Sequence, residues 1–367
     1  MFYKNIIIAF GIAFFATLMP VCAIANDEHN ETKTEPAEKL PVGEIIAEHI
    51  ADSYWWHITT INEHHVSVYL PVIVCTQDNG WQVFSSKHLA HGEPYNGLYI
   101  AKEGKYKGKI VGTNAETGAE YKPWDISITK NVLALMVNST IMLVLFLSVS
   151  RWYRRRPKNA VPSGFVCAVE MFVMDVEEDV IKASIGKDYK RYSPYLLTAF
   201  FFILINNAMG IIPIFPGGAN TTGNIAITCV LGLCTMVAVN LFGNREYWKE
   251  VFWPDVPVWL KVPIPIIPAI ELFSVFTKPF ALMIRLLANI FAGHTVILAL
   301  TFLVFLTVKM GIGVNAGMTV FSVILSIVMN CLELLVAYIQ AYVFTLLSAV
   351  FIGLSRPEHH VAKVKNK

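Results

Sequence analysis

The sequence predicts an all-α integral membrane protein with a small β-rich region ahead of its membrane helices. Of the 367 residues, 55% are hydrophobic and only 15% are charged, whereas an ordinary soluble domain carries roughly 25% charged residues. From residue 132 onward, apolar runs recur that are each long enough for a membrane helix. Basic clusters follow alternate runs, as expected if Lys and Arg concentrate on the cytoplasmic side. These three observations predict about five membrane passages.

Residues 1–25 are organised like a secretory signal peptide. Lys4 precedes an apolar run, and Ala23-Ile24-Ala25 provides a small-x-small cleavage site. Cleavage there would leave the mature N-terminus outside the cytoplasm. Two alternatives are a lipoprotein modified at Cys22, which the large Val21 disfavours, and an uncleaved anchor, which would leave the start inside.

A leader and an extracytoplasmic region follow. Residues 26–43 are polar, contain proline and lack periodicity, which is typical of a flexible leader. Residues 44–130 contain alternating stretches such as HHVSVYLPVIV and GLYIAKEGKYKGKIVG, which predict short strands and hairpins. Six histidines fall in this region: His49, His57, His64, His65, His88 and His91. Their spacing matches no metal-ligand motif and indicates polar surface in preference to a metal site.

Three apolar runs predict single passages of the membrane. They are residues 132–149, 195–212 and 225–242. Four arginines and a lysine between 151 and 158 mark the cytoplasmic end of the first run, and a Gly/Pro/Asn loop follows the second. The charged and aromatic segment NREYWKE after the third run fits the cytoplasmic interface.

Residues 164–192 contain too many carboxylates to cross a membrane. Apolar residues nevertheless recur there at helical spacing: Phe165, Ala168, Val169, Phe172, Val173, Val176, Val180 and Ile181. This pattern predicts an amphipathic helix at the cytoplasmic interface. The pattern fits a solvated linker helix as well as a partner-binding helix.

Two long apolar helices, 269–308 and 317–354, complete the predicted membrane domain of residues 131–355. The glycine-rich MGIGVNAG joins them, and the prolines up to Pro268 exclude a regular helix before about Ala269. A straight passage needs about 20 residues, so helices of roughly twice that length are tilted or lie partly along the membrane. The basic tail 356–367 is predicted to be cytoplasmic.

Ionisable residues form a stripe on the first long helix. Glu271, Lys278 and Arg285 are seven residues apart, and each step of seven drifts by only about 20° around a helix. Asn289 continues the stripe, whereas His294 lies about 180° from Arg285. An arginine at membrane depth costs about 2.5–3.5 kcal/mol on insertion scales, so Arg285 is a candidate functional residue.

A matching polar line runs along the final helix through Glu333 and Gln340. Polar groups at membrane depth must meet protein or an aqueous cavity, so both lines are expected to face one or the other. A structural alternative is a buried Arg285–Glu333 ion pair that only holds the two helices together.

Several motifs together resemble the a subunit of the rotary F-type ATP synthase. They are RLLANIFAGH at 285–294 with the preceding Glu271 and Lys278-Pro279, ELLVAYIQAYVF at 333–344, FILINNAMGIIP at 202–213 and TTGNIAITCVLGL at 221–233. The likeness covers residues of about 130–355, and the motifs are specific in combination. The β-rich region is longer than the family core requires.

The resemblance implies a multi-pass stator subunit of the bacterial inner membrane, with its mature N-terminus outside and its C-terminus in the cytoplasm. Its partners would be a ring of c subunits, the b-subunit peripheral stalk, other ATP synthase subunits and the lipid bilayer. Arg285 aligns with the family's essential arginine, which favours proton release from each passing ring carboxylate and blocks leakage between two half-channels. The sequence leaves proton and sodium-ion coupling both open.

The resemblance also assigns roles to other polar residues. Asn289 and Gln340 would hold the arginine and water in place, and Glu271, His294 and Glu333 match half-channel positions. Lys278, Asn206 and Asn207 are weaker candidates for the same path. Many bacterial relatives carry a carboxylate at the position of His294 and a histidine at that of Glu333. This exchange leaves open which of the two relays the ion.

The same residues exclude or disfavour other functions. No GxxxxGK[ST] phosphate loop is present, so the chain is not predicted to hydrolyse nucleotides. We expect a non-catalytic subunit without cofactor, metal or nucleic-acid partner. A secondary ion transporter would show paired repeats with broken helices, and the sequence contains no internal repeat. A structural membrane scaffold with a buried Arg–Glu pair is the second alternative.

Overall fold

The computed structural model describes residues 52–355, apart from 62–63, 77–79, 91, 93, 102–103, 105, 114–119, 158–160, 213–216, 220, 242 and 253–265. The predicted signal peptide, leader and basic tail lie outside these residues. The described chain falls into two compact units. Residues 52–140 and 209–221 form the cap unit, and residues 141–208 and 222–355 form the helical unit.

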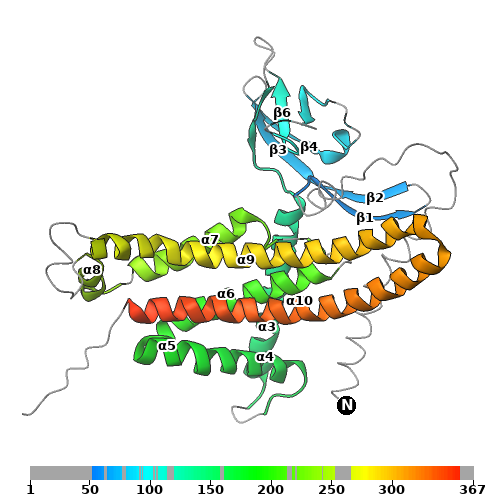
Figure 1. Cartoon of the computed structure of the whole chain (residues 1–367). Helices are drawn as coiled ribbons and strands as arrows, with labels where there is room; N and C mark the ends of the chain where they lie inside the picture. Colours follow the sequence, from blue (N-terminus) through cyan, green and yellow to red (C-terminus); the bar gives the residue numbers. More distant parts are fainter. Residues whose placement is uncertain are drawn as a thin grey trace, which may run out of the picture. The chain divides into compact units, whose positions relative to one another are not determined.

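The cap unit contains eight short strands in its described part. They are β1 (Trp55–Ile61), β2 (His64–Tyr69), β3 (Pro71–Thr76), β4 (Gly80–Ser85), β5 (Leu98–Ile100), β6 (Ile110–Thr113), β7 (Glu120–Tyr121) and β8 (Trp124–Asp125). They form antiparallel sheets in the orders β1-β2, β4-β3-β8 and β5-β6-β7 (Figure 1). The predicted β-rich N-terminal region is therefore confirmed.

The core of the cap unit follows from the alternation in β3. Val72 and Val74 are fully buried and pack with Leu98 and Ile110, while the residues between them are partly exposed. Such a period of two is what a half-buried strand requires. The alternating stretches of the sequence thus correctly predicted strands.

Two polar side chains of the cap unit make hydrogen bonds that link distant parts of it. The Tyr54 hydroxyl donates to the Asp125 carboxylate at 2.5 Å. A second carboxylate, Asp52, accepts from the backbone N–H of Asn131 at 3.1 Å and so caps the first turn of helix α3 (Lys130–Arg155).

The rest of the described chain is helical. Its helical elements are α3 (Lys130–Arg155), α4 (Phe165–Met174), the π-helical η2 (Asp175–Lys182), α5 (Ala183–Ile185), η3 (Gly186–Asp188), α6 (Tyr189–Ile211), α7 (Ile225–Leu241), α8 (Arg245–Phe252), α9 (Ile266–Thr307), η5 (Val308–Met310) and α10 (Ile312–Leu354). Four stretches in the described residues are long and apolar enough to cross a membrane: 130–155, 165–211, 269–307 and 312–354, with the shorter apolar α7 beside them. The predicted all-α membrane fold is confirmed.

Both long helices begin earlier than predicted. Helix α9 starts at Ile266, because Pro268 falls in its first turn, where no backbone hydrogen bond is lost. Helix α10 starts at Ile312, so most of the glycine-rich MGIGVNAG is helical instead of forming the connection. The chain turns at Gly311, whose φ of 105° is readily available only to glycine. Gly313 and Gly317 lie in open space and are tolerated within the helix.

The predicted amphipathic segment 164–192 packs against the helical unit. Val176, Val180 and Ile181 are fully buried in the core that α6 and α10 share. Two of the carboxylates that interrupt its apolar pattern also bind protein hydroxyls: Asp175 accepts from Tyr338 at 3.1 Å, and Glu177 accepts from Ser193 at 3.1 Å. The segment is thus part of the packed helical unit, although its place at a membrane interface stays a prediction.

Candidate functional site

Helices α9 and α10, with 42 and 43 residues, lie antiparallel and side by side (Figure 1). Two contacts fix their register. A Cβ atom added to Gly293 of α9 would lie 2.7 Å from Oε1 of Glu333 on α10. Nearer the start of α9 and the end of α10, the Lys278 ammonium lies 5.5 Å from the ring centroid of Phe351. The two polar lines of the sequence therefore lie on helices that contact each other.

The Glu333 carboxyl is the least satisfied group of this site. Its side chain is only 7% exposed, and neither carboxyl oxygen has a hydrogen-bond partner among the described residues. Buried polar atoms are almost always hydrogen-bonded, by protein or by water, since leaving one unpaired costs roughly 1–3 kcal/mol. Because Arg285 does not bond Glu333, the two do not form the buried pair that a purely structural scaffold would need.

Gln340 lies at about the same level of the helix pair as Arg285. Gln340 follows Glu333 by seven residues on α10, and Glu333 lies opposite Gly293 of α9. Because the two helices are antiparallel, the position on α9 opposite Gln340 is about seven residues before Gly293. That point is the turn that carries Arg285. Gln340 is 5% exposed and therefore faces the interior of the helical unit, as predicted for this line.

Arg285 itself is exposed on the surface of the helical unit. Ala281, Ala288 and Ala292 are also exposed and lie within about 60° of Arg285 around the helix. Small residues on a membrane helix let another helix approach closely. The arginine stripe was expected to face protein or an aqueous cavity, and within this chain Arg285 faces outward.

The other residues of the stripe are partly buried. Glu271, Lys278 and Asn289 share this intermediate exposure. Lys278 is directed to Phe351, whereas Glu271 lies close enough to Tyr247 of α8 to act on it electrostatically. Burial, followed by this Glu271 charge, raises the pKa of the Tyr247 phenol.

His294 follows Gly293 directly and is partly buried. Because Gly293 contacts Glu333, the helix packing brings His294 to the same level as that carboxyl. The exchanged acid and imidazole of the sequence therefore lie at one level of the α9–α10 pair. A direct bond between them does not follow from this packing.

Asn206 and Asn207 form a second polar cluster near the end of α6. Both side chains are buried, at 2% and 1% exposure. The Asn207 amide oxygen accepts from the Thr222 hydroxyl at 2.7 Å, and the Asn206 amide donates to the Phe202 carbonyl at 2.8 Å. The Thr222–Asn207 bond ties the segment before α7 to α6, whereas the Asn206 bond stays within α6.

The sequence interpretation missed several residues that shape the site. Gly293 was quoted only within a motif, although its missing side chain makes room for Glu333. The Thr235 hydroxyl of α7 also joins three helices, lying 3.2 Å from the Tyr195 hydroxyl of α6 and 3.4 Å from that of Ser348 on α10. Buried hydroxyls of this kind hold membrane helices together. A contact between distant helices leaves no local sequence signal.

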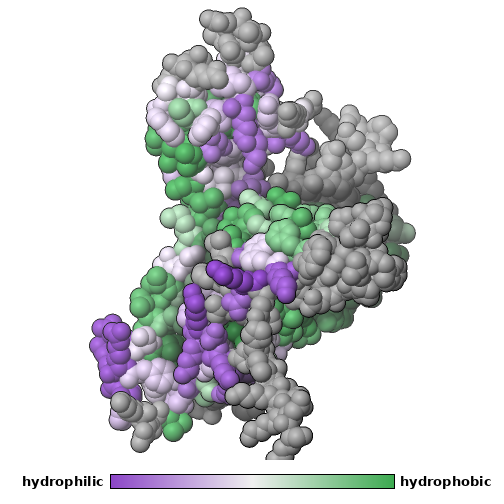
Figure 2. All heavy atoms as spheres, turned by 90° about the vertical axis from the view of Figure 1, so that its left-hand side faces the viewer, coloured by the Kyte–Doolittle hydropathy of each residue, from purple (hydrophilic) through white to green (hydrophobic). Residues whose placement is uncertain are grey.

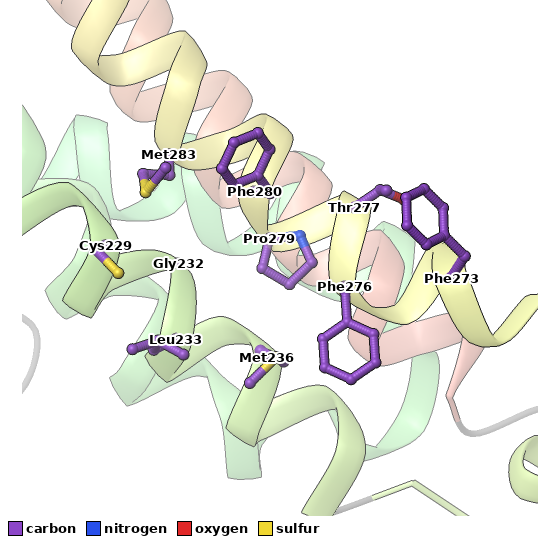
Figure 3. Close-up of a pocket in the computed structure, with 10 residues that line it drawn as sticks. All are labelled: Cys229, Gly232, Leu233, Met236, Phe273, Phe276, Thr277, Pro279, Phe280 and Met283. Atoms are coloured by element: carbon purple, nitrogen blue, oxygen red, sulfur yellow. The ribbon is translucent and has the colours of Figure 1, made fainter. Parts of the chain in front are cut away.

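Helix α7 also packs closely on α9 beside an apolar groove. A Cβ atom on Gly232 would lie 3.0 Å from the Pro279 carbonyl oxygen. In Figure 3, Phe276, Pro279 and Met283 point from α9 toward α7. The groove has a volume of about 480 Å³, and none of its lining residues is charged. Within the residues that the structure describes, no cluster of three or more His, Cys, Asp and Glu could hold a metal ion.

Comparison with known proteins gives two family matches. A model described as "ATP synthase A chain" matches residues 134–353, and a model of a domain of unknown function matches residues 45–127. The first match covers more than half of the chain and contains all the candidate site residues.

Named bacterial relatives agree with the first match. ATP synthase subunit a of Chlorobium phaeobacteroides (strain DSM 266) is 42% identical over 243 residues, which is 65% of this chain and 68% of the relative. The Pelodictyon phaeoclathratiforme protein of the same name is 42% identical over 63% of this chain and 66% of its own length. That of Myxococcus xanthus is 39% identical over 63% of this chain and 73% of its own length. The aligned regions thus span about two thirds of the first two relatives.

Proposed function

We infer the function from the family: the chain belongs to the ATP synthase A chain family and is a bacterial membrane-sector subunit of the F-type ATP synthase. We propose that it carries protons to and from a ring of c subunits. In this proposal Arg285 faces the ring, and the interior between α9 and α10 lines an aqueous half-channel. The observation that carries the proposal is an exposed Arg285 and, about two helical turns further along the same helix pair, a buried Glu333 carboxyl with no hydrogen-bond partner among the described residues.

The exposure of Arg285 supports a partner outside the chain. A guanidinium on the surface of an apolar helix is costly in lipid unless an anion or water meets it. The exposed alanines beside it leave room for a helix that carries this anion. A ring carboxylate that passes Arg285 would be stabilised in its ionised form and would release its proton. Because guanidinium does not lose its own proton, it would not relay protons and would separate the two half-channels.

The buried Glu333 supports a water-filled path on the inner side of the helix pair. Its carboxyl oxygens need hydrogen-bond donors that the described chain does not supply. Water in a half-channel would supply them, and Glu333 and His294 would exchange protons with that water. Gln340 and Asn289 would orient water beside Arg285, while Glu271, Lys278, Asn206 and Asn207 would line more distant parts of the path.

The remaining expectations complete the proposed setting. The subunit would lie in the inner membrane, contact the b-subunit stalk and other ATP synthase subunits, and leave nucleotide chemistry to them. Its signal peptide would be removed, placing the mature N-terminus outside and the C-terminus in the cytoplasm. Each proton that crosses a potential of 100 mV would supply about 2.3 kcal/mol to ring rotation.

The proposal is tested by Arg285→Ala in inverted membrane vesicles that contain the assembled enzyme. We expect assembly to be normal and ATP-driven proton pumping to be lost, because no fixed cation remains opposite the ring carboxylate. Arg245→Ala is the matched control, since Arg245 is exposed on α8 outside the candidate site. Normal pumping by an assembled Arg285→Ala enzyme would overturn the proposed role.

A further inference from the structure

A second groove of the helical unit runs between α6 and α7 and is separate from the α9–α10 site. Its volume is about 430 Å³. Its lining residues come from these two helices: Arg191, Tyr192, Tyr195, Val230, Leu233, Cys234, Val237 and Ala238. The groove therefore combines one cation with an otherwise uncharged wall.

The Arg191 guanidinium at the margin of the groove contacts one aromatic ring. The Arg191 guanidinium lies 5.9 Å from the ring centroid of Tyr192, a cation–π contact. Tyr192 is only 4% exposed, and the Tyr195 hydroxyl lies 3.2 Å from that of Thr235. These contacts fix the floor of the groove and restrain the guanidinium at its margin.

The apolar wall of the groove faces away from the protein core. Val230, Leu233 and Val237 of α7 are 58%, 46% and 46% exposed. On a helix of a membrane protein, such side chains contact hydrocarbon chains. The volume and the apolar wall suit an acyl chain, and Arg191 in the first turn of α6 lies where a lipid headgroup meets such a helix.

Charge complementarity favours an anionic headgroup. Lys187 and Lys190 are exposed next to Arg191 in the sequence, and they outnumber the acidic Asp188. Figure 2, coloured by hydropathy, shows hydrophilic residues on the side of the helical unit that carries α5 and α8; the positive sign at the groove comes from Lys187, Lys190 and Arg191. The groove between α7 and α9 differs, because no charged residue lines it and it could not select a headgroup.

We propose that the α6–α7 groove binds one anionic phospholipid, with an acyl chain along Val230, Leu233 and Val237 and the headgroup phosphate at Arg191. A guanidinium can donate two parallel hydrogen bonds to a phosphate, which makes this a selective contact. The lipid would fill the space between two helices that the Thr235 hydroxyl already joins, and would stabilise their packing.

The test measures lipid binding to the purified, delipidated full chain in detergent by native mass spectrometry. Phosphatidylglycerol is the anionic probe and phosphatidylcholine the zwitterionic comparison. We expect Arg191→Gln to weaken phosphatidylglycerol binding about tenfold, the value of one charge-assisted contact. Lys190→Gln removes the same charge from the neighbouring residue, which does not line the groove, and is expected to change binding less than about twofold.

A second pair of variants tests the acyl-chain part. Val237→Trp fills the groove and should lower the affinity for both lipids, whereas Ile225→Trp, at a 58% exposed position of α7 outside the groove, should not. Circular dichroism and the melting temperature identify any variant that fails to fold. Arg191→Lys then provides a folded variant that keeps the charge but loses the paired hydrogen bonds, and should show an intermediate affinity.

Three outcomes would overturn the assignment. Equal losses in Arg191→Gln and Lys190→Gln would show general surface attraction. Binding of inorganic phosphate that depends on Arg191, without any bound phosphatidylglycerol, would show that the groove holds only a free anion. In the assembled enzyme, a photoreactive group on Cys234 that cross-links to another protein chain in preference to phospholipid would show that a partner helix occupies the groove.

Discussion

The Tyr54–Asp125 pair of the cap unit and the Glu333 carboxyl of the α9–α10 pair differ in whether the chain itself supplies a hydrogen-bond partner. In the cap unit, Tyr54 and Asp125 bond each other at 2.5 Å. In the helix pair, the buried Glu333 carboxyl has no partner among the described residues, and Arg285 faces outward. A polar group that stabilises a fold is paired within it, whereas one that handles ions must remain available to water or to a partner.

The largest effect expected from this contrast is loss of transport without loss of stability in Glu333→Leu. Leucine removes a buried carboxyl that the chain does not pair, so the melting temperature of the assembled enzyme should stay the same or rise. Proton pumping should fall roughly 100-fold or more, the usual contribution of a positioned acid–base group. Vesicle pumping and thermal melting are the two measurements. Normal pumping in the leucine variant would show that Glu333 only fills space.

Gly293→Ala should give the next largest loss of transport. The new methyl group would lie 2.7 Å from Oε1 of Glu333 and would displace the carboxyl. Because a shift of about 1 Å in a reacting group can cost as much as 100-fold in rate, we expect pumping to fall by about 10- to 100-fold. Assembly should be unaffected, since the end of a flexible side chain can move aside.

The matched control for Gly293→Ala is Gly317→Ala. Gly317 is a helical glycine of α10 with open space around it, so alanine should stabilise the helix by about 1 kcal/mol without affecting transport. Equal pumping by both variants would contradict the importance of the Gly293–Glu333 contact. A loss of assembly in Gly293→Ala would instead assign the glycine to packing.

How far the sequence could predict these features depends on whether the signal is local. The membrane helices, the strands of the cap unit and the stripe through Arg285 follow from hydrophobic period and charge spacing. The glycines at the start of α10 were misread as a connection, because a glycine signals a turn or is tolerated in a helix depending on its surroundings. The contact between Gly293 and Glu333 spans 40 positions of the chain and depends on helix packing, which no local pattern encodes.

A smaller effect, on stability alone, is expected for Tyr54→Phe in the cap unit. Removal of the hydroxyl leaves the Asp125 carboxylate short of a donor, which costs about 1–3 kcal/mol. Hydrogen exchange of peptides from β3 and β8, measured on the full chain, reports this loss directly. Tyr99→Phe is the matched control, because its hydroxyl donates to Glu120 over the same 2.5 Å but on the surface. Its expected change is within about 0.5 kcal/mol, and equal losses in the two variants would show that burial does not decide the effect.

The smallest expected effect is a dependence of cap stability on alkaline pH. Burial, followed by the hydrogen bond to Asp125, raises the pKa of the Tyr54 phenol above its ordinary value. The folded chain therefore keeps a proton that the unfolded chain releases above about pH 10, so this contribution is complete below pH 10 and declines as the pH rises beyond it. The melting temperature, followed from about pH 8 to pH 11, should fall more steeply in the natural protein than in Tyr54→Phe. Parallel curves would show that the phenol is not desolvated in the folded cap, and the contrast with the unpaired Glu333 would then rest on hydrogen bonding alone.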